Sequence, residues 1–296
     1  MTMRLDQSDL DALHDVQRDL LLEFDTVCRQ NGLRYQLAAG TLLGAIRHGD
    51  IFPWDDDVDV IMPRDDYEQL MSIGQNVFSK DLFLQTRKSD LTYKSLFARL
   101  RRNDSELRFS WDRSDTHNGI FIDIFPMDFV SPNSIRGYLQ RLLIAALRIG
   151  ERVAYYTPAD RTSERILMSR ISKRIIAKFF ALVPLDGYLS MIEAVMAWYR
   201  SRNTGHVACL TQLTPLQLLN AERVRPASEL IDCCRVPLRG SLFPAPREYD
   251  VTLTRLYGNY MELPPVSQRI NPHPIVGFKL PGHQADDRSL DRDSVV

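Results

Sequence analysis

The 296-residue chain has little of what marks secreted, membrane-spanning or nucleic-acid-binding proteins. Its four cysteines include no C-x-x-C pair, so we expect a reduced cytosolic protein without a disulfide framework or structural zinc. No run of about 18 apolar residues predicts a membrane span, and four aspartates within the first 15 residues argue against a cleaved leader. The net charge of −1 gives no overall attraction to nucleic acid, which we therefore do not expect as a partner.

The most informative feature that is present is an acidic run at residues 50–59, which leads directly into an apolar strand pattern. Its five carboxylates belong to Asp50, Asp55, Asp56, Asp57 and Asp59. Like charges this close repel one another and raise each other's pKa, so a divalent cation is the simplest way to neutralise them. Metal-bound carboxylates beside a glycine turn suit chemistry on phosphate groups.

Strand alternation predicts how these carboxylates would share a metal. In the strand that follows the run, Asp57 and Asp59 lie on one face and can grip one ion. A later strand over residues 119–126 places Asp123 among large apolar residues, where a carboxylate is costly unless it is paired or metal-bound. We therefore predict these three aspartates as metal ligands. An EF-hand fits less well, because Val60 stands where its loop requires glycine.

A glycine turn precedes the acidic run. Gly40 is predicted to make the turn and residues 41–47 to form a short helix, whose N-terminal N–H groups would face an anion. Arg47 could then clamp a diphosphate, as could Arg64 beyond the run, although each could also form a salt bridge with a neighbouring aspartate. Trp54 could stack on a base or pack in front of the metal loop.

Four segments of the chain together resemble the LicD family of phosphotransferases. They read GTLLGAIR at 40–47, FPWDDDVD at 52–59, MPRDDY at 62–67 and FIDIFPMD at 121–128. Residues 244–265 resemble the C-terminal part of that family, so the similarity covers roughly residues 10–130 and 240–275.

The resemblance implies a nucleotidyltransferase-like fold and transfer of phosphocholine, or a related phospho-alcohol, from a CDP-linked donor to a glycan. By this resemblance, Asp57, Asp59 and Asp123 match the family's catalytic metal positions. Gly40 and Thr41 match its phosphate-side turn, and Arg47 matches the basic residue after that turn. Where we expect a lysine in the family's pattern, this chain has Arg99, which keeps the charge but contacts phosphate differently.

The patterns predict an α/β (α+β) fold, in which helices flank a small mixed sheet and a helical subdomain follows. Helices are predicted over residues 8–30, with Ser8 as N-cap, 41–47, 65–73, much of 135–182, 185–202 and 247–260. Strands are predicted over residues 34–38, 58–62, 83–85, 96–100 and 119–126. The predicted domains are a catalytic core (1–130), a basic helical subdomain (131–205), a C-terminal segment that completes the catalytic domain (206–280) and a disordered tail (281–296).

Residues 135–180 are a basic stretch of helical pattern, with ten Arg or Lys and three acidic residues. Apolar residues such as Ile175 and Phe179 interleave with Lys173 and Arg174, as in a helix that lies on anionic lipid. An ordinary amphipathic helix that caps the core fits equally. RNA binding is disfavoured because few aromatic residues accompany the charge. We expect a cytoplasmic protein that is peripheral on the inner face of the membrane.

The sequence thus predicts a transferase with Mg²⁺ or Mn²⁺ as cofactor, acting on a glycan such as lipopolysaccharide, capsule or teichoic acid, or on its lipid-linked precursor. Its predicted substrate contacts are Gly40, Thr41, Arg47, Trp54, Asp56, Arg64 and Arg99. Asp123 could also take the proton of the acceptor hydroxyl, and His48 and His273 are candidate acid–base groups. Two alternatives stay open: a D-x-D glycosyltransferase, which would release a nucleoside diphosphate instead of CMP, and a non-catalytic membrane-surface scaffold.

Overall fold

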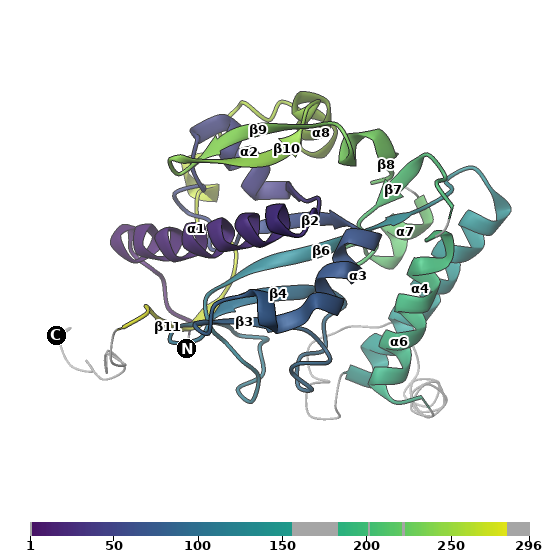
Figure 1. Cartoon of the computed structure of the whole chain (residues 1–296), viewed down its shortest axis with the longest axis horizontal. Helices are drawn as coiled ribbons and strands as arrows, with labels where there is room; N and C mark the ends of the chain where they lie inside the picture. Colours follow the sequence, from purple (N-terminus) through teal and green to yellow (C-terminus); the bar gives the residue numbers. More distant parts are fainter. Residues whose placement is uncertain (1, 156–182, 201, 221–222, 283–296) are drawn as a thin grey trace. The chain divides into compact units, whose positions relative to one another are not determined.

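The computed structural model describes residues 2–155, 183–200, 202–220 and 223–282, and it confirms the predicted α+β class (Figure 1). The chain divides into two compact units, which are interleaved in sequence. Unit 1 comprises residues 1–60, 69–124 and 233–296, and unit 2 comprises residues 61–68 and 125–232. Strand β2 (Asp59–Pro63) and strand β6 (Phe121–Phe129) begin in unit 1 and end in unit 2, whereas helix α3 (Arg64–Ile73) begins in unit 2 and ends in unit 1.

Unit 1 contains most of the sheet structure. Its helices are α1 (Gln7–Gln30), α2 (Ala39–His48) and α8 (Tyr249–Tyr257), with 3-10 turns at Gly74–Val77 and Val266–Gln268. Its remaining strands are β1 (Gln36–Leu37), β3 (Leu82–Gln85), β4 (Ala98–Arg102), β5 (Glu106–Phe109), β9 (Cys233–Leu238), β10 (Ser241–Pro246) and β11 (Ile275–Lys279).

The main sheet has the strand order β1-β2-β6-β4-β3. Strand β4 lies antiparallel between β3 and β6, and its register with β6 places Arg99 directly opposite Asp123. Strands β9 and β10 form an antiparallel hairpin that contacts β1 and α2, and β11 pairs with β5. The strands β5, β9, β10 and β11 were not predicted, because β5 and β11 are short and β9 and β10 contain proline.

Helix α1 supports the main sheet and, as described below, the acidic run. Its apolar face is fully buried, with Leu13, Leu21 and Phe24 inaccessible to solvent. The predicted stop at residues 31–32 is confirmed, since Asn31 is the C-cap and Gly32 has a φ of +65°. The predicted N-cap is wrong: Ser8 lies inside the helix, and the Asp6 carboxylate accepts the N–H of Asp9 instead.

Helix α2 begins one residue before Gly40, so the predicted glycine turn in front of the helix is wrong and this glycine lies in the first helical turn. Its lack of a side chain still matters, because a Cβ there would lie 3.1 Å from Oδ2 of Asp55. Gly44, one turn further on, lies against the carbonyl oxygen of Asp50, only 2.6 Å from where its Cβ would be. The two glycines therefore allow the acidic run to pack directly on α2.

Unit 2 contains the helices α4 (Ile135–Tyr155), α6 (Leu185–Met196) and α7 (Pro215–Asn220), 3-10 turns at Ala197–Tyr199 and Ala227–Leu230, and the strands β7 (His206–Ala208) and β8 (Arg225–Pro226). Helices α4 and α6 pack together, and the buried amide of Gln140 donates to the carbonyl oxygens of Val195 and Met196. The predicted helical stretch beyond residue 155, up to residue 182, and most of the predicted disordered tail (281–296) lie outside the described residues. Among the helices that are described, none combines the length and apolarity needed to cross a bilayer.

Candidate active site

The backbone of the acidic run is fixed by side chains from two helices of unit 1. From α1, Nε2 of His14 donates to the carbonyl oxygen of Asp55 at 2.9 Å, and the buried amide of Gln17 donates to that of Asp56 at 2.8 Å. From α2, the hydroxyl of Thr41 accepts the N–H of Asp59 at 2.8 Å. These bonds use the main chain, so the run is held rigidly while its carboxylates stay available to a ligand.

The carboxylates of the run raise one another's pKa. Burial, followed by the charge of Asp56, raises the pKa of Asp57 to about 6. Burial raises the pKa of Asp59 well above its usual value, and Asp57 and Asp123 add to the shift. The pKa of Asp55 is raised for the same reasons, by burial and then by Asp57. Such a concentration of partly buried negative charge is costly without a cation, and perturbed carboxylates of this kind are typical of functional sites.

Asp123, the third predicted ligand, pairs with an arginine of the neighbouring strand. Nε of Arg99 donates to Oδ1 of Asp123 at 2.6 Å, and its NH2 group lies 3.4 Å from Oδ2. The guanidinium also lies over the ring of Phe121, 4.0 Å from its centroid. Burial raises the pKa of Asp123 even though Arg99 lowers it. A second buried arginine, Arg101, donates to Gln85 and to the carbonyl oxygen of Gly119.

Asp56 is the most deeply buried carboxylate of the run, with none of its surface exposed. Its Oδ1 accepts a bond of 2.6 Å from Nδ1 of His273, whereas its Oδ2 is buried and has no hydrogen-bond partner. The same Nδ1 lies 4.0 Å from Oδ2 of Asp57. Within the part of the chain that the structure describes, these three residues are the one group of potential metal ligands whose donor atoms all lie within 4.8 Å of one another.

His273 comes from the segment before β11, and aromatic rings hold it in place. The centroids of the Phe109 and Trp111 rings lie 5.0 and 5.6 Å from the imidazole centroid. Burial would lower the pKa of His273, but its bond to Asp56 and the charge of the acidic run raise it overall. The sequence identified His273 only as a candidate acid–base group, because nothing in the sequence pattern connects it with Asp56.

The charges around the run fit a divalent cation. The cationic groups near the run are the guanidiniums of Arg99 and Arg101 and the imidazole of His273. They face five carboxylates, those of Asp55, Asp56, Asp57, Asp59 and Asp123. Even with the imidazole protonated, two negative charges are left without a cation. The orphaned Oδ2 of Asp56 is a second sign, because a buried carboxylate oxygen without a partner is expensive. The residues present therefore fit a metal such as Mg²⁺ or Mn²⁺.

The other predicted substrate contacts are held by protein groups. Arg47 donates to the carbonyl oxygens of Tyr260 and Glu262, and its guanidinium lies 4.7 Å from the ring centroid of Phe52. Trp54 stacks on that same Phe52 ring at 5.4 Å. Both residues thus help to pack unit 1 beside the acidic run, and their contact with a substrate stays a prediction.

Arg64 belongs to unit 2. It forms a buried, two-pronged ion pair with Asp128, with N–O distances of 2.7 and 2.8 Å. Of the two roles considered for Arg64, the structure therefore contains the salt bridge with an aspartate.

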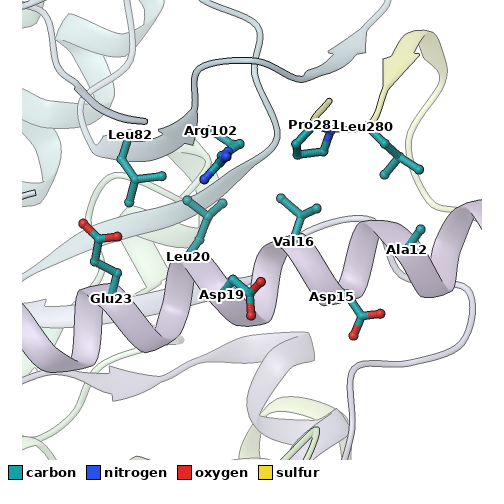
Figure 2. Close-up of a pocket in the computed structure, with 10 residues that line it drawn as sticks. All are labelled: Ala12, Asp15, Val16, Asp19, Leu20, Glu23, Leu82, Arg102, Leu280 and Pro281. Carbon is teal, nitrogen blue, oxygen red and sulfur yellow. The ribbon is translucent and has the colours of Figure 1, made fainter. Parts of the chain in front are cut away.

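A separate cleft of about 390 Å³ lies between α1 and the β3–β4 edge of unit 1 (Figure 2). Three acidic residues of α1, with Arg102 opposite, give it a charged lining. All three acids are already bound, since Asp15 accepts from Arg239, Asp19 from Arg18 and Glu23 from the N–H of Ser79. This cleft lacks the clustered carboxylates of the acidic run, and we do not assign it to the reaction.

Comparisons with known proteins agree with the composition of this site. Residues 32–140 match the family model described as "LicD/FKTN/FKRP, nucleotidyltransferase domain", a range that includes the acidic run, Arg99 and Asp123. The chain is 24% identical over 268 residues to the "Lipopolysaccharide cholinephosphotransferase LicD" of Haemophilus influenzae, and this alignment covers 87% of the chain and 92% of that protein.

A shorter match is more similar. Over 29 residues, the chain is 69% identical to the human "Ribitol 5-phosphate transferase FKRP", which is 10% of this chain and 6% of that protein. A stretch of 54 residues is 37% identical to the "Uncharacterized protein RP689" of Rickettsia prowazekii, covering 18% of this chain and 20% of that protein. The family resemblance expected from the four sequence segments is confirmed: residues 32–140 match the nucleotidyltransferase-domain model of LicD, FKTN and FKRP, and most of the chain is similar to the Haemophilus LicD protein.

Proposed function

We propose that this protein transfers phosphocholine, or a related phospho-alcohol, from a CDP-linked donor to a hydroxyl group of a glycan, and that it releases CMP. Lipopolysaccharide or a lipid-linked glycan precursor is the acceptor that its similarity to the Haemophilus protein favours. The observation that carries the proposal is the rigidly held acidic run, whose clustered carboxylates need a cation in a domain of this family. Similarity to a transferase along most of the chain supports a transferase activity in general.

The metal would be held by Asp57, Asp59 and Asp123, with Asp56 beside them. When bound, a divalent cation neutralises the donor diphosphate and stabilises the negative charge that develops on the departing CMP. The excess of carboxylates over cationic side chains supports this assignment.

The N-terminus of α2 is suited to hold phosphate oxygens. Its N-cap residue is Ala38, which has no side chain that could satisfy the N–H groups of the first turn, including those of Gly40 and Thr41. Free N–H groups at a helix N-terminus bind anions, so they would stabilise the equatorial oxygens of the transferred phosphoryl group. Arg47 lies at the other end of this helix and would add positive charge near the donor.

Asp123 would accept the proton of the acceptor hydroxyl as this hydroxyl attacks the phosphorus. Its pairing with Arg99 fixes the direction of the carboxylate and favours the ionised form that a base requires. In this role Arg99 acts through Asp123 and orients it, in addition to its predicted contact with the donor.

The test is a screen for CMP release from CDP-choline, CDP-ethanolamine, CDP-glycerol and CDP-ribitol, each with Mg²⁺ or Mn²⁺ and a lipopolysaccharide acceptor. We expect one donor to be turned over and the Asp57→Asn variant to be inactive. Release of a nucleoside diphosphate from a nucleotide-sugar would instead establish the glycosyltransferase alternative. A folded protein that binds no metal and turns over no donor would be a scaffold.

We further propose that α4 docks on an anionic membrane surface near lipid-linked acceptors. Large apolar side chains on one side of this helix are exposed, among them Ile135 at 83%, Leu139 at 46% and Ile149 at 51%. An exposed apolar stripe on an amphipathic helix is the usual feature of interfacial binding. Two of its basic residues serve internal roles: Arg141 donates to carbonyl oxygens of residues 131 and 132, and Arg148 pairs with Glu151.

Vesicle co-sedimentation tests this docking. Binding should increase with anionic lipid and fall with salt, and the Lys173→Glu/Arg174→Glu double variant should weaken it. Those two residues lie outside the described part of the chain. Leu139→Asp tests the described stripe separately, with Leu242→Asp, a leucine of unit 1 that is also exposed, as control. Wild-type protein that stays in the supernatant at low salt with strongly anionic vesicles would contradict the proposal.

A further inference from the structure

The C-terminal segment brings an unexpected donor atom to the acidic run. We propose that Asp56, Asp57 and His273 form a cation-binding site in which the imidazole is a ligand, so that the protein binds a divalent transition metal such as Mn²⁺ more tightly than Mg²⁺. This inference rests on the proposed metal-dependent function, and it changes the expected donor set from three aspartates to a set that includes a histidine.

The first support is the geometry of the three donor atoms. They all lie within 4.8 Å of one another, and they come from both ends of unit 1 in sequence. Asp56 has no exposed surface, and one of its two carboxylate oxygens is buried without a hydrogen-bond partner. A fully buried oxygen without a partner costs free energy unless something binds it. The imidazole of His273 and the unpartnered Oδ2 of Asp56 belong to the same small group of atoms, and a cation bound there could contact both.

The second support is that the imidazole is held in place independently of the carboxylates. Ser110 donates its N–H to the carbonyl oxygen of Pro274 at 2.9 Å, next to the pairing of β11 with β5. The side chain of Asn271 accepts the N–H of His273 at 3.2 Å. With Phe109 and Trp111 packed against the ring, the imidazole is positioned by its own segment and by the end of β5. On the other side, Gln17 fixes the main chain of Asp56.

The third support is the chemistry of the donor set. Mg²⁺ binds oxygen ligands and retains several waters, and an imidazole is a poor substitute for either. First-row transition metals accept imidazole together with carboxylates, and their affinity for such mixed sites exceeds that of Mg²⁺. A site with two carboxylates and one imidazole therefore favours a transition metal, whereas a site made only of aspartates would not distinguish the two classes as strongly.

A different role for His273 makes the opposite prediction. A protonated imidazole could serve only as the partner of Asp56, as a positive charge that the metal must compete with. Replacing it would then remove a competing cation and increase the affinity for metal. If the imidazole is a ligand, replacing it removes a donor atom and reduces the affinity. The sign of the change separates the two roles.

The experiment is calorimetric titration of the full chain with Mn²⁺ and with Mg²⁺, in the absence of donor and acceptor. We expect Mn²⁺ to bind more tightly, and His273→Gln to weaken Mn²⁺ binding about tenfold or more while Mg²⁺ affinity changes little. Asp56→Asn should weaken both metals. The matched control is His117→Gln, since His117 bonds to Asn103 and takes no part in the acidic run. An unchanged or increased Mn²⁺ affinity in His273→Gln would overturn the proposal.

A spectroscopic measurement on the wild-type protein covers the case in which the variant does not fold. Pulsed electron paramagnetic resonance of bound Mn²⁺ should show the nuclear coupling of a ligating imidazole nitrogen. Its absence in a protein that binds Mn²⁺ would overturn the inference and leave the proposed function unaffected if CMP release persists. Conversely, nitrogen coupling in a protein that releases no CMP would support the site and contradict the phosphotransfer.

Discussion

The buried ion pair between Arg64 and Asp128 allows a direct test of whether Arg64 stabilises the fold or contacts the substrate. Arg64 was predicted to contact substrate, yet its Nε and one of its terminal nitrogens donate to the two carboxylate oxygens of Asp128. We expect Arg64→Met to destabilise unit 2 strongly, because it leaves the Asp128 carboxylate buried without a partner.

The magnitude follows from the burial of both groups. The side chains are 8% and 1% exposed, so neither charge is solvated when the other is removed. Burial raises the pKa of Asp128 even with Arg64 in place, which shows how unfavourable the charged carboxylate is in these surroundings. Breaking a buried pair of this kind costs about 3–5 kcal/mol, whereas replacing both partners by apolar residues is often close to neutral.

The assay is urea denaturation of the wild type, Arg64→Met, Asp128→Leu and the double variant. We expect each single variant to lose about 3–5 kcal/mol and the double variant to recover most of this loss. Arg200→Met is the control, because Arg200 is half exposed and its pairs with Asp65 and Glu68 should each contribute less than about 1 kcal/mol.

Two results would refute this reasoning. One is a single variant whose free energy of unfolding stays within about 1 kcal/mol of the wild type, and the other is a double variant that loses the sum of the two single effects. CMP release by the double variant then decides the predicted substrate role. A stable but inactive double variant would show that Arg64 also acts on the substrate, while full activity would make it a residue of the fold alone.

Three further predictions concern the acidic run. Asp57→Asn and Asp59→Asn should abolish CMP release while leaving the urea midpoint unchanged or slightly higher, because each removes one of several repelling charges; near wild-type turnover at saturating Mg²⁺ would disprove the metal assignment. Asp123→Ala should weaken metal binding in calorimetry, and lower thermal stability with unchanged metal affinity would identify a purely structural carboxylate. Gly40→Ala should lower kcat/KM without loss of stability, since its Cβ would displace the Asp55 carboxylate by a few tenths of an ångström while alanine favours the helix; an unaltered kcat/KM would show that this carboxylate tolerates displacement.

Local patterns in the sequence were sufficient to predict features that depend on a single helix or strand. The apolar face of α1 depends on neighbours three or four positions away and was predicted correctly. The strand predicted at residues 58–62 is present as Asp59–Pro63, but Ile61 is buried along with Val60 and Met62 and so does not follow the predicted alternation. The end of α1 at Asn31-Gly32 followed from local backbone preference. Its start did not, because Asp6 and Ser8 are both good N-caps and only the path of the preceding chain decides between them.

Pairing between strands could not be predicted in the same way. That Asp123 lies in an apolar strand was visible, and it implied that the carboxylate must have a cationic partner or a metal. The identity of the partner depends on the register of β4 against β6, which places Arg99 exactly opposite. A shift of one residue would have placed Arg99 on the other face of the sheet, and no local signal at residues 98–102 fixes that register.

The position of His273 shows the same limit over a longer distance, and it explains why the acidic run looked complete without it. The bond between Asp56 and His273 joins residues 217 positions apart. It forms because β11 pairs with β5 through a bulged register, and because the last residue of β5 and the turn after it supply two aromatic rings for the imidazole. A cluster of aspartates indicates a cation from sequence alone, because carboxylates that are close in sequence repel one another whatever the rest of the fold. In the proposed site the kind of cation depends on His273, the one ligand that is not an aspartate, and His273 reaches the acidic run only when β11 has paired with β5.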